Sequence, residues 1–283
     1  MKSSGTLRNR IKELKSAEGG IEVLSVNSVG ALADEFKLTY KSVELSALES
    51  CVLPLRYLRN LGTVGWDGQA TLLRSSVAVI GLGGLGGYVV EGLARMGIGS
   101  LVLVDGDIFA DHNLNRQIFS SESMLAHSKA DSASARVAEI NSATEVTIHH
   151  NWLTPDNASD IIVGADVVVD CLDALDTRLF LQSCAQSLGL PLVHGAIAGY
   201  TGQVMSIFPG DIGLRAFYST EKAPRHGVEQ RYGNPAATPM MVAAWQIQEV
   251  VKILLKTGKP LRNRMLLMDA EMGRVQLVSI SSS

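Results

Sequence analysis

The residues of this sequence that could carry chemistry follow one glycine-rich turn. Residues 77–86 read "VAVIGLGGLG", so an apolar run leads directly into Gly81, Gly83, Gly84 and Gly86. Glycine has no Cβ atom, so it lets the backbone approach a phosphate, and a helix starting behind the turn directs free N–H groups at that anion. Asp105 ends the next apolar run, where its carboxylate can accept hydrogen bonds from ribose hydroxyls. The pattern predicts an adenine-nucleotide site and leaves ATP and NAD equally possible.

Four further residues separate these two nucleotides. The stretches "GDIFADHNLNRQIF", "HSKADSASARV" and "VVVDCLDALDTR" supply Asn113, Arg116, Lys129 and Asp173. Hydride transfer needs a flat apolar slot for nicotinamide, whereas a triphosphate needs cations on its oxygens and a carboxylate for Mg²⁺. One amide, two cations and one carboxylate meet the second requirement, although each alone could equally be a helix cap or a surface ion pair.

The elements that must position these residues alternate regularly from residue 75. Apolar strands are expected at "SVAVIG", "SLVLVD", "EVTIHH", "DVVVDCLD" and within "LPLVHGAIAGYTGQVMSIF". Helices are expected between them, at residues 84–96, 128–140, 157–163 and 176–188, and a long helix ends near Gly258 and Pro260. "RMLLMD" and "RVQLVSI" then predict an antiparallel hairpin. The fold class is therefore α/β, a Rossmann-like doubly wound sheet, mostly parallel, with antiparallel C-terminal strands.

Two segments fall outside this alternation. Residues 1–54 are expected to form a short helical N-terminal extension, with two amphipathic helices in "VGALADEFKLTYKSVELSALES", and residues 55–283 the nucleotide-binding domain. We expect packing helices rather than a DNA-binding helix-turn-helix, because acidic residues outnumber lysines there. Residues 210–235 are rich in Gly, Pro and charge, and are expected to form a long functional crossover loop.

Composition bounds the function. The chain has 283 residues, 46% of them hydrophobic, and a formal charge of -3, so it can bury a large core and has no basic bias toward nucleic acid or an anionic membrane. Neither a signal peptide nor an apolar run long enough to span a membrane is evident. The three cysteines, Cys51, Cys171 and Cys184, are odd in number and far apart. We expect a cytoplasmic protein with no disulfide framework.

The ordered motifs resemble the ThiF/MoeB/HesA family, bacterial relatives of ubiquitin-activating enzymes. The resemblance covers residues 55–280 and includes "RYLRNLGTVGWDGQATLLRSSVAVIGLGGLG", "LVLVDGDIFADHNLNRQ", "HSKADSA", "DCLDALDTR" and "GQVMSIFPG" in the family's order and spacing. Several ordered motifs are far more specific than a single glycine turn.

The resemblance implies a role for each candidate residue. The turn glycines would line the nucleotide and Asp105 would hold the ribose. Asn113, Arg116 and Lys129 would contact phosphates, and Asp173 would position Mg²⁺. Arg59, in "RYLRN", matches an arginine that the family's dimers insert into the neighbouring subunit's active site, which implies a homodimer.

The implied reaction is adenylation of a carboxylate by ATP, with pyrophosphate as the leaving group. The family's usual substrate is the C-terminal glycine of a small ubiquitin-like sulfur-carrier protein ending in Gly-Gly, in sulfur-containing cofactor biosynthesis. Three alternatives stay open: adenylation of another carboxylate (peptide, amino acid or tRNA-bound), an NAD(P)-dependent oxidoreductase, and a non-catalytic adaptor. The sequence does not identify the carrier or its pathway.

Two departures from the family pattern concern cysteines. Many members hold zinc with two C-x-x-C pairs, but the corresponding stretches here, "GLRAFYST" and "VEQRYGNP", contain no cysteine, so we expect no structural zinc. Some relatives also use a cysteine in the 210–235 loop to link the carrier, and this loop has none. Cys171 and Cys184 fall in apolar contexts typical of inert core thiols, which favours a mechanism that stops at the adenylate.

Overall fold

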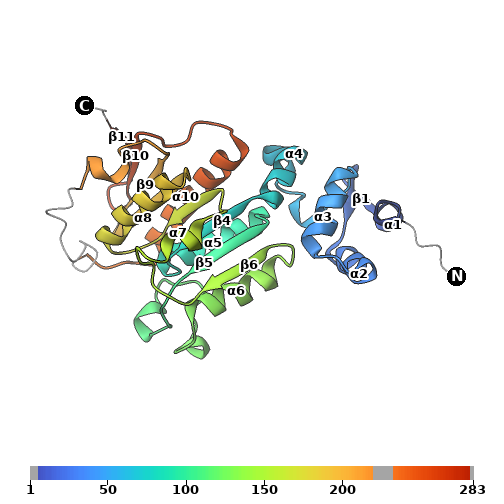
Figure 1. The fold of residues 1–283 in the computed structure, drawn as a ribbon, viewed down its shortest axis with the longest axis horizontal. Helices are drawn as coiled ribbons and strands as arrows, with labels where there is room; N and C mark the ends of the chain where they lie inside the picture. Colours follow the sequence, from blue (N-terminus) through green and yellow to red (C-terminus); the bar gives the residue numbers. More distant parts are fainter. Residues whose placement is uncertain (1–5, 219–231, 281–283) are drawn as a thin grey trace.

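The computed structural model, which describes residues 6–218 and 232–280, is built around one large twisted sheet (Figure 1). Within those residues the sheet has eight strands in the order β11-β10-β9-β8-β7-β4-β5-β6. Their bounds are β4 (Ser76–Ile80), β5 (Ser100–Val104), β6 (Glu145–His149), β7 (Val167–Asp170), β8 (Leu192–Ala198), β9 (Thr201–Ile207), β10 (Arg264–Asp269) and β11 (Arg274–Ser279).

The sheet is parallel on one side and antiparallel on the other. Strands β4 to β8 pair in parallel with their neighbours, whereas β8–β9, β9–β10 and β10–β11 are antiparallel pairs. The central strands β4 and β7 are buried along nearly their whole length, which is why they read as continuous apolar runs. The predicted fold class, including the antiparallel C-terminal hairpin, is confirmed.

Helices cover both faces of the sheet. Helices α5 (Gly84–Met96), α6 (Lys129–Ile140) and α10 (Ala237–Leu255) pack on one face. Helices α7 (Ala158–Ile162) and α8 (Leu175–Ser187) pack on the other. Alternate residues of a strand serve the two faces: Val77 and Val79 belong to the first core, and Ala78 and Ile80 to the second. The chain therefore has the three layers of a doubly wound domain.

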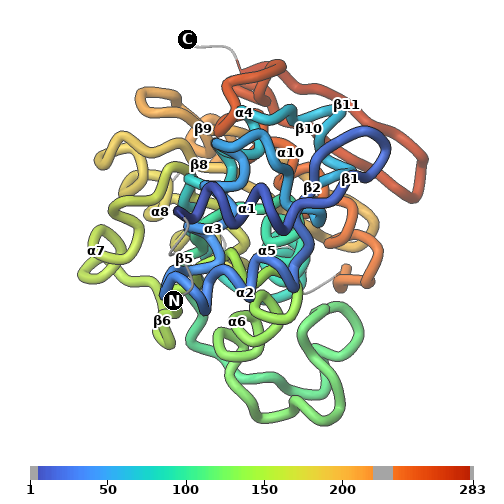
Figure 2. The backbone as a smooth tube through the Cα atoms, turned by 90° about the vertical axis from the view of Figure 1, so that its right-hand side faces the viewer, coloured from blue at the N-terminus to red at the C-terminus, as the bar shows by residue number. Residues whose placement is uncertain are grey.

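The N-terminal extension forms a small unit at one end of the molecule (Figures 1 and 2). It contains α1 (Leu7–Leu14), β1 (Ser16–Glu18), β2 (Ile21–Leu24), α2 (Val26–Phe36), α3 (Tyr40–Glu49) and β3 (Leu53–Pro54) around its own apolar cluster. Both helices expected between residues 29 and 50 are present. The three-stranded sheet β1-β2-β3 is an addition to the purely helical extension that the sequence led us to expect.

A buried polar network joins the extension to the large sheet. The Glu44 carboxylate lies 3.2 Å from the Arg56 guanidinium and accepts a 3.0 Å hydrogen bond from the Tyr57 hydroxyl. Tyr57 in turn accepts a hydrogen bond from Asn141, at the C-terminus of α6. Burial raises the pKa of Glu44 above its ordinary value, against the opposing effects of Arg56 and Tyr57. These contacts fix the extension near the amino ends of β5 and β6.

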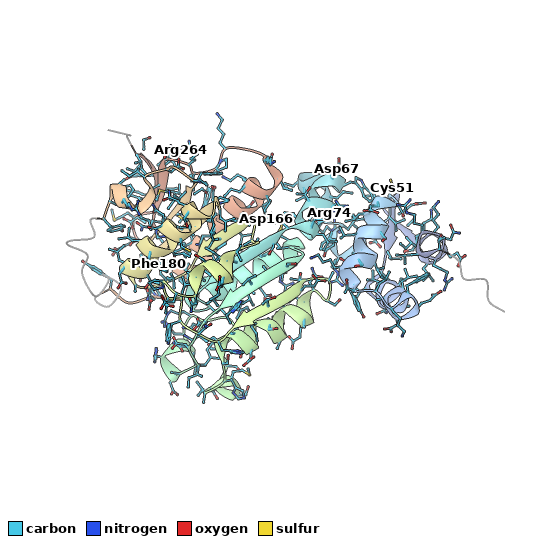
Figure 3. The ribbon with its side chains drawn as sticks, viewed as in Figure 1. Cys51, Asp67, Arg74, Asp166, Phe180 and Arg264 are labelled. Carbon is cyan, nitrogen blue, oxygen red and sulfur yellow. The ribbon has the colours of Figure 1, made fainter. Side chains whose placement is uncertain are left out.

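The chain enters the sheet through η1 (Leu55–Tyr57) and α4 (Leu61–Arg74), which is interrupted at Gly65, where φ is +74°. Figure 3 labels Arg74 at the end of α4, with Asp166 near it. The Asp166 carboxylate accepts a 2.8 Å hydrogen bond from the Ser76 N–H at the start of β4. Because these residues precede the parallel strands, this end of the sheet lies opposite the glycine turn.

The expected 210–235 loop is described only at its two ends. A short helix, η4 (Gly213–Ala216), packs against α8, and residues 219–231 lie outside the described residues. No helix in the described part of the chain is long and apolar enough to cross a membrane.

Candidate functional site

The glycine turn between β4 and α5 is shaped by two positions that exclude a side chain. Gly81 has φ +90°, and a Cβ there would lie 2.7 Å from the carbonyl oxygen of Cys171. A Cβ on Gly86 would lie 1.8 Å from the carbonyl oxygen of Gly81. Helix α5 begins at Gly84, and no side chain caps it at Gly83. Its first-turn N–H groups therefore face the space above the sheet, as an anion site requires.

Asp105 holds the turn in place. One carboxylate oxygen accepts a 2.7 Å hydrogen bond from the N–H of Leu82, and the other accepts a 2.8 Å bond from the N–H of Asp107. Each carboxylate oxygen can accept a second hydrogen bond, so the residue can still bind ribose hydroxyls. The sequence predicted the residue and its place at the end of β5, but not this contact with the turn.

Asn113 and Arg116 lie on the connection after β5, which includes η2 (Asp111–Asn113) and η3 (Glu122–Met124). Asn113 is buried, and its side-chain oxygen accepts a 3.0 Å bond from the N–H of Ala110. The Arg116 side chain is directed toward Gly84, because a Cβ added there would lie 3.5 Å from its Cγ. Burial lowers the pKa of Arg116, so its environment favours a bound anion.

Lys129 is the first residue of α6 and is almost fully buried. Its ammonium group lies 2.9 Å from the carboxylate of Asp107, which is nearly half exposed. A cation at a helix N-terminus is electrostatically unfavourable, so Asp107 stabilises the lysine in that place. Asp107, in the "DGD" that follows β5, is a site residue that we did not single out from the sequence.

Asp173 lies in the turn between β7 and α8, and its side chain is exposed to the same space. Within residues 6–218 and 232–280, no hydrogen bond or ion pair engages its carboxylate. A free carboxylate beside several cations fits a Mg²⁺ ion carried by a triphosphate. No group of three or more His, Cys, Asp or Glu side chains in the described residues could hold a metal ion by itself. The prediction that the protein has no structural zinc stays a prediction.

All the predicted nucleotide residues except Gly86 line one cavity of about 1250 Å³, and Gly86 lies beneath the turn. This volume exceeds the roughly 300–1,000 Å³ of common small-molecule pockets. The cavity extends from the glycine turn over the antiparallel strands, where Gln203, Arg274 and Gln276 line it. Trp152, 63% exposed, lines it at the end that contains Gly106. The cavity therefore has room for a nucleotide and part of a second substrate.

Arg59, unlike the predicted nucleotide residues, lies far from this cavity. It is exposed in the connection between η1 and α4, near the opposite end of the sheet. Cys171 lines the cavity but is buried, and burial raises its thiol pKa well above the ordinary value. Cys184 is buried on α8.

The sequence profile described as the ThiF family matches residues 57–283. The chain belongs to the ThiF family. Adenylyltransferase and sulfurtransferase MOCS3-2 of Zea mays is 38% identical over 234 residues, which are 81% of this chain and 48% of the relative. The SAMP-activating enzyme E1 of Haloferax volcanii is 36% identical over 220 residues, 76% of this chain and 81% of that protein. This ThiF-family chain thus spans about half the length of the MOCS3 relatives it matches.

Solved structures share the fold at lower sequence identity. E. coli MccB with ATP superposes with a TM-score of 0.67 at 21% identity, over 81% of this chain and 72% of that chain. PaaA superposes with a TM-score of 0.68 at 19% identity, over 99% of this chain and 87% of that chain. The second match includes the N-terminal extension, so the arrangement of both parts recurs in a solved structure.

Proposed function

We propose that this ThiF-family chain is an ATP-dependent adenylyltransferase. A carboxylate oxygen of the substrate attacks the α-phosphate of Mg·ATP, the bond to the β-phosphate breaks, and pyrophosphate leaves, giving an acyl-adenylate. The observation that carries the proposal is the convergence of the glycine turn, Asp105, Arg116, Lys129 and Asp173 on one cavity with room for a nucleotide and part of a second substrate.

The chain's own residues bind and orient rather than react. The first turn of α5 and Asp105 hold the phosphates and the ribose, and Arg116 and Lys129 offset the charge that develops as pyrophosphate departs. Asp173 would hold Mg²⁺, which supplies further neutralisation of the phosphate charge when bound. No side-chain nucleophile is required, and the buried Cys171 and Cys184 are poorly suited to be one.

We propose a small ubiquitin-like sulfur carrier ending in Gly-Gly as the partner. The similarity to a SAMP-activating enzyme E1 and to MOCS3 proteins supports this choice. A narrow glycine tail also suits the part of the cavity over β9–β11, because it would lie across Gln203 and reach the glycine turn. Free cysteines suit a reducing compartment, which supports a cytoplasmic location.

The proposal includes a homodimer in which Arg59 acts in the partner's site. An arginine that is exposed and distant from the cavity of its own chain is placed to reach another chain. A guanidinium makes bidentate contacts with phosphate and stays protonated at all physiological pH values, so it would serve there as a fixed cation.

Adenylation of a peptide carboxylate is the second candidate. The fold likeness to E. coli MccB, solved with ATP and with N-formylated MccA, favours it over an amino-acid substrate. It uses the same nucleotide site and differs only in what occupies the cavity over the antiparallel strands.

ATP–pyrophosphate exchange tests the proposal. Purified protein receives labelled pyrophosphate, Mg·ATP and one of three additions: a Gly-Gly-tailed carrier, the same carrier with its C-terminal carboxylate amidated, or a synthetic peptide. Exchange with the free carrier alone supports the first candidate, and exchange with the peptide alone supports the second. Binding of NADH but not Mg·ATP in a thermal-shift assay would favour an oxidoreductase and overturn both.

A further inference from the structure

The residue directly before the carboxylate assigned to Mg²⁺ is held at both its N–H and its carbonyl oxygen. The N–H of Leu172, directly before Asp173, donates a 3.0 Å hydrogen bond to one oxygen of Asp170. The carbonyl oxygen of Leu172 accepts two hydrogen bonds from the Arg178 guanidinium, one of them 3.0 Å long. The position of Asp173 therefore depends on Asp170 and Arg178.

Asp170 is itself held by a buried histidine. It is fully buried at the end of β7, and its second oxygen lies 2.6 Å from Nδ1 of His194, which is also fully buried. The two residues are register partners on β7 and β8, so the sheet itself sets this contact. Arg178 lies 4.0 Å from the first oxygen. A buried carboxylate without such partners is strongly unfavourable, so the histidine is needed to hold Asp170 in its place.

The other ring nitrogen of His194, Nε2, points to the part of the cavity over β9–β11, where we propose that the carboxylate substrate lies. Nε2 lies 3.1 Å from the side-chain nitrogen of Gln203, which also lies 3.4 Å from the Tyr218 hydroxyl. With the amide nitrogen of Gln203 facing it, Nε2 accepts a hydrogen bond, and Nδ1 carries the proton donated to Asp170. Gln203 and Tyr218 both line the cavity. One neutral imidazole thus joins the Asp173 turn to the strand that faces the second substrate.

We propose that His194 is a positioning residue that fixes Asp173 for Mg·ATP through Asp170 and fixes Gln203 for the carboxylate substrate through Nε2. This inference rests on the proposed function, because it presumes that Asp173 serves the metal. Hydrogen bonds made directly to a metal ligand are worth about 10- to 100-fold in metal affinity or activity, and His194 acts one step further away, so we expect an effect at the lower end of that range.

Two amide variants separate the two sides of the imidazole. His194→Asn keeps an N–H near the position of Nδ1 and loses the group facing Gln203. His194→Gln places its amide near the position of Nε2 and loses the contact with Asp170. We expect the Kd for Mg·ATP to rise about tenfold in His194→Gln and to stay within about twofold of the wild-type value in His194→Asn. The Kd for ATP in EDTA should be unchanged in both.

For the carboxylate substrate, we expect the two His194 variants to rank in the opposite order. In ATP–pyrophosphate exchange, His194→Asn should raise the KM for the carboxylate substrate, while its KM for Mg·ATP stays near that of the wild type. Asn141→Leu is the matched control, because it disrupts a buried hydrogen-bond network around Tyr57 at the other end of the sheet. That variant should lower Tm without altering the Mg²⁺ dependence of ATP binding.

The outcomes separate this inference from the proposed function. Failure of the wild-type protein to bind Mg·ATP would overturn both. If the wild type binds Mg·ATP and both His194 variants show the Mg²⁺ dependence of the wild type, the positioning role is wrong while adenylation stands. Should His194→Gln fail to fold, Arg178→Lys, which retains the charge but loses one of the two bonds to Leu172, must weaken Mg·ATP binding without weakening binding of ATP in EDTA.

Discussion

Lys129 begins a helix, where a positive charge is unfavourable, and it is almost completely buried. Helix initiation alone does not explain a buried lysine at this position. Asp107, whose carboxylate is nearly half exposed, is its single ion-pair partner in the described residues. The ion pair keeps the Lys129 ammonium group beside the glycine turn, where a bound phosphate can contact it as well.

Replacing this lysine should affect catalysis more than folding. In Lys129→Met, Asp107 remains hydrated, so we expect the free energy of unfolding to change by less than about 1 kcal/mol. The value of kcat/KM for ATP should fall about a hundredfold, because a preorganised cation is lost. Lys15→Met is the control, since Lys15 pairs with Glu22 within the N-terminal extension, far from the cavity. Equal losses of activity in both variants would show that charge removal alone is responsible.

The three thiols should differ sharply in reactivity. Cys51 is exposed, whereas Cys171 and Cys184 are buried, and burial raises the pKa of the Cys171 thiol well above its ordinary value. The thiolate is the reactive form, so we expect Ellman's reagent at pH 8 to titrate one thiol in the folded protein and three after denaturation. Cys51→Ser should then remove the fast-reacting thiol. A fast-reacting thiol that remains in that variant would support a cysteine nucleophile.

At the scale of elements, the turn between β4 and α5 offers a matched pair of glycines. A Cβ on Gly86 would lie 1.8 Å from the Gly81 carbonyl oxygen, which is backbone and cannot move aside. A Cβ on Gly84 would lie 3.5 Å from the flexible Arg116 side chain. The sequence shows both as glycines of one motif, and only the structure distinguishes their requirements.

Gly86→Ala should therefore be destabilising and Gly84→Ala tolerated. We expect the first to lower the free energy of unfolding by about 1–3 kcal/mol and to abolish Mg·ATP binding, since the turn must open. The second should lie within about 0.5 kcal/mol of the wild type. Urea unfolding and calorimetric titration with Mg·ATP measure the two effects. Similar results for the two variants would mean that the backbone of the turn is flexible enough to accommodate a side chain at Gly86.

The elements that were predictable are those whose pattern is local. Helix α5 spans residues 84–96 as expected, because its apolar period lies between glycine signals at both ends. The hairpin β1-β2 was not predicted, since its strands are three and four residues long and bury only Val23 and Leu24. It is held instead by pairing with Leu53 and Pro54, about thirty residues away.

The same distinction applies to the site. Motif order located the glycine turn, Asp105, Arg116, Lys129 and Asp173, and the structure brings them to one cavity. The contacts that hold them were not predicted, because those contacts depend on long-range geometry. Asp170 meets His194 only through the register of β7 with β8, two strands whose paired residues are buried and apolar apart from these two, so their pattern does not single out one pairing.

At the scale of the whole molecule, the two ends of the parallel strands have separate tasks. The carboxyl ends of β4, β5 and β7 open into the cavity, as expected for an open α/β sheet. The N-terminal extension is fixed near the amino ends of β5 and β6, through Lys41, Arg56 and Tyr57. Arg59 follows this junction, so rigid docking of the extension also sets where that arginine is presented. In the proposed homodimer, each site would receive Arg59 from the second chain.

Mixed dimers test this requirement. Arg59→Ala and Asp173→Ala should each inactivate a homodimer, one by withdrawing the cation given to its partner and the other by damaging its own site. In a heterodimer purified with two different tags, the Arg59→Ala subunit retains Asp173 and receives Arg59 from its partner. One of the two sites is then complete, so roughly half of the wild-type exchange activity should return. Asp173→Ala with Lys129→Ala is the control, because each subunit's own site stays damaged and activity should remain lost. No recovery in the first pair would assign Arg59 a role within its own chain.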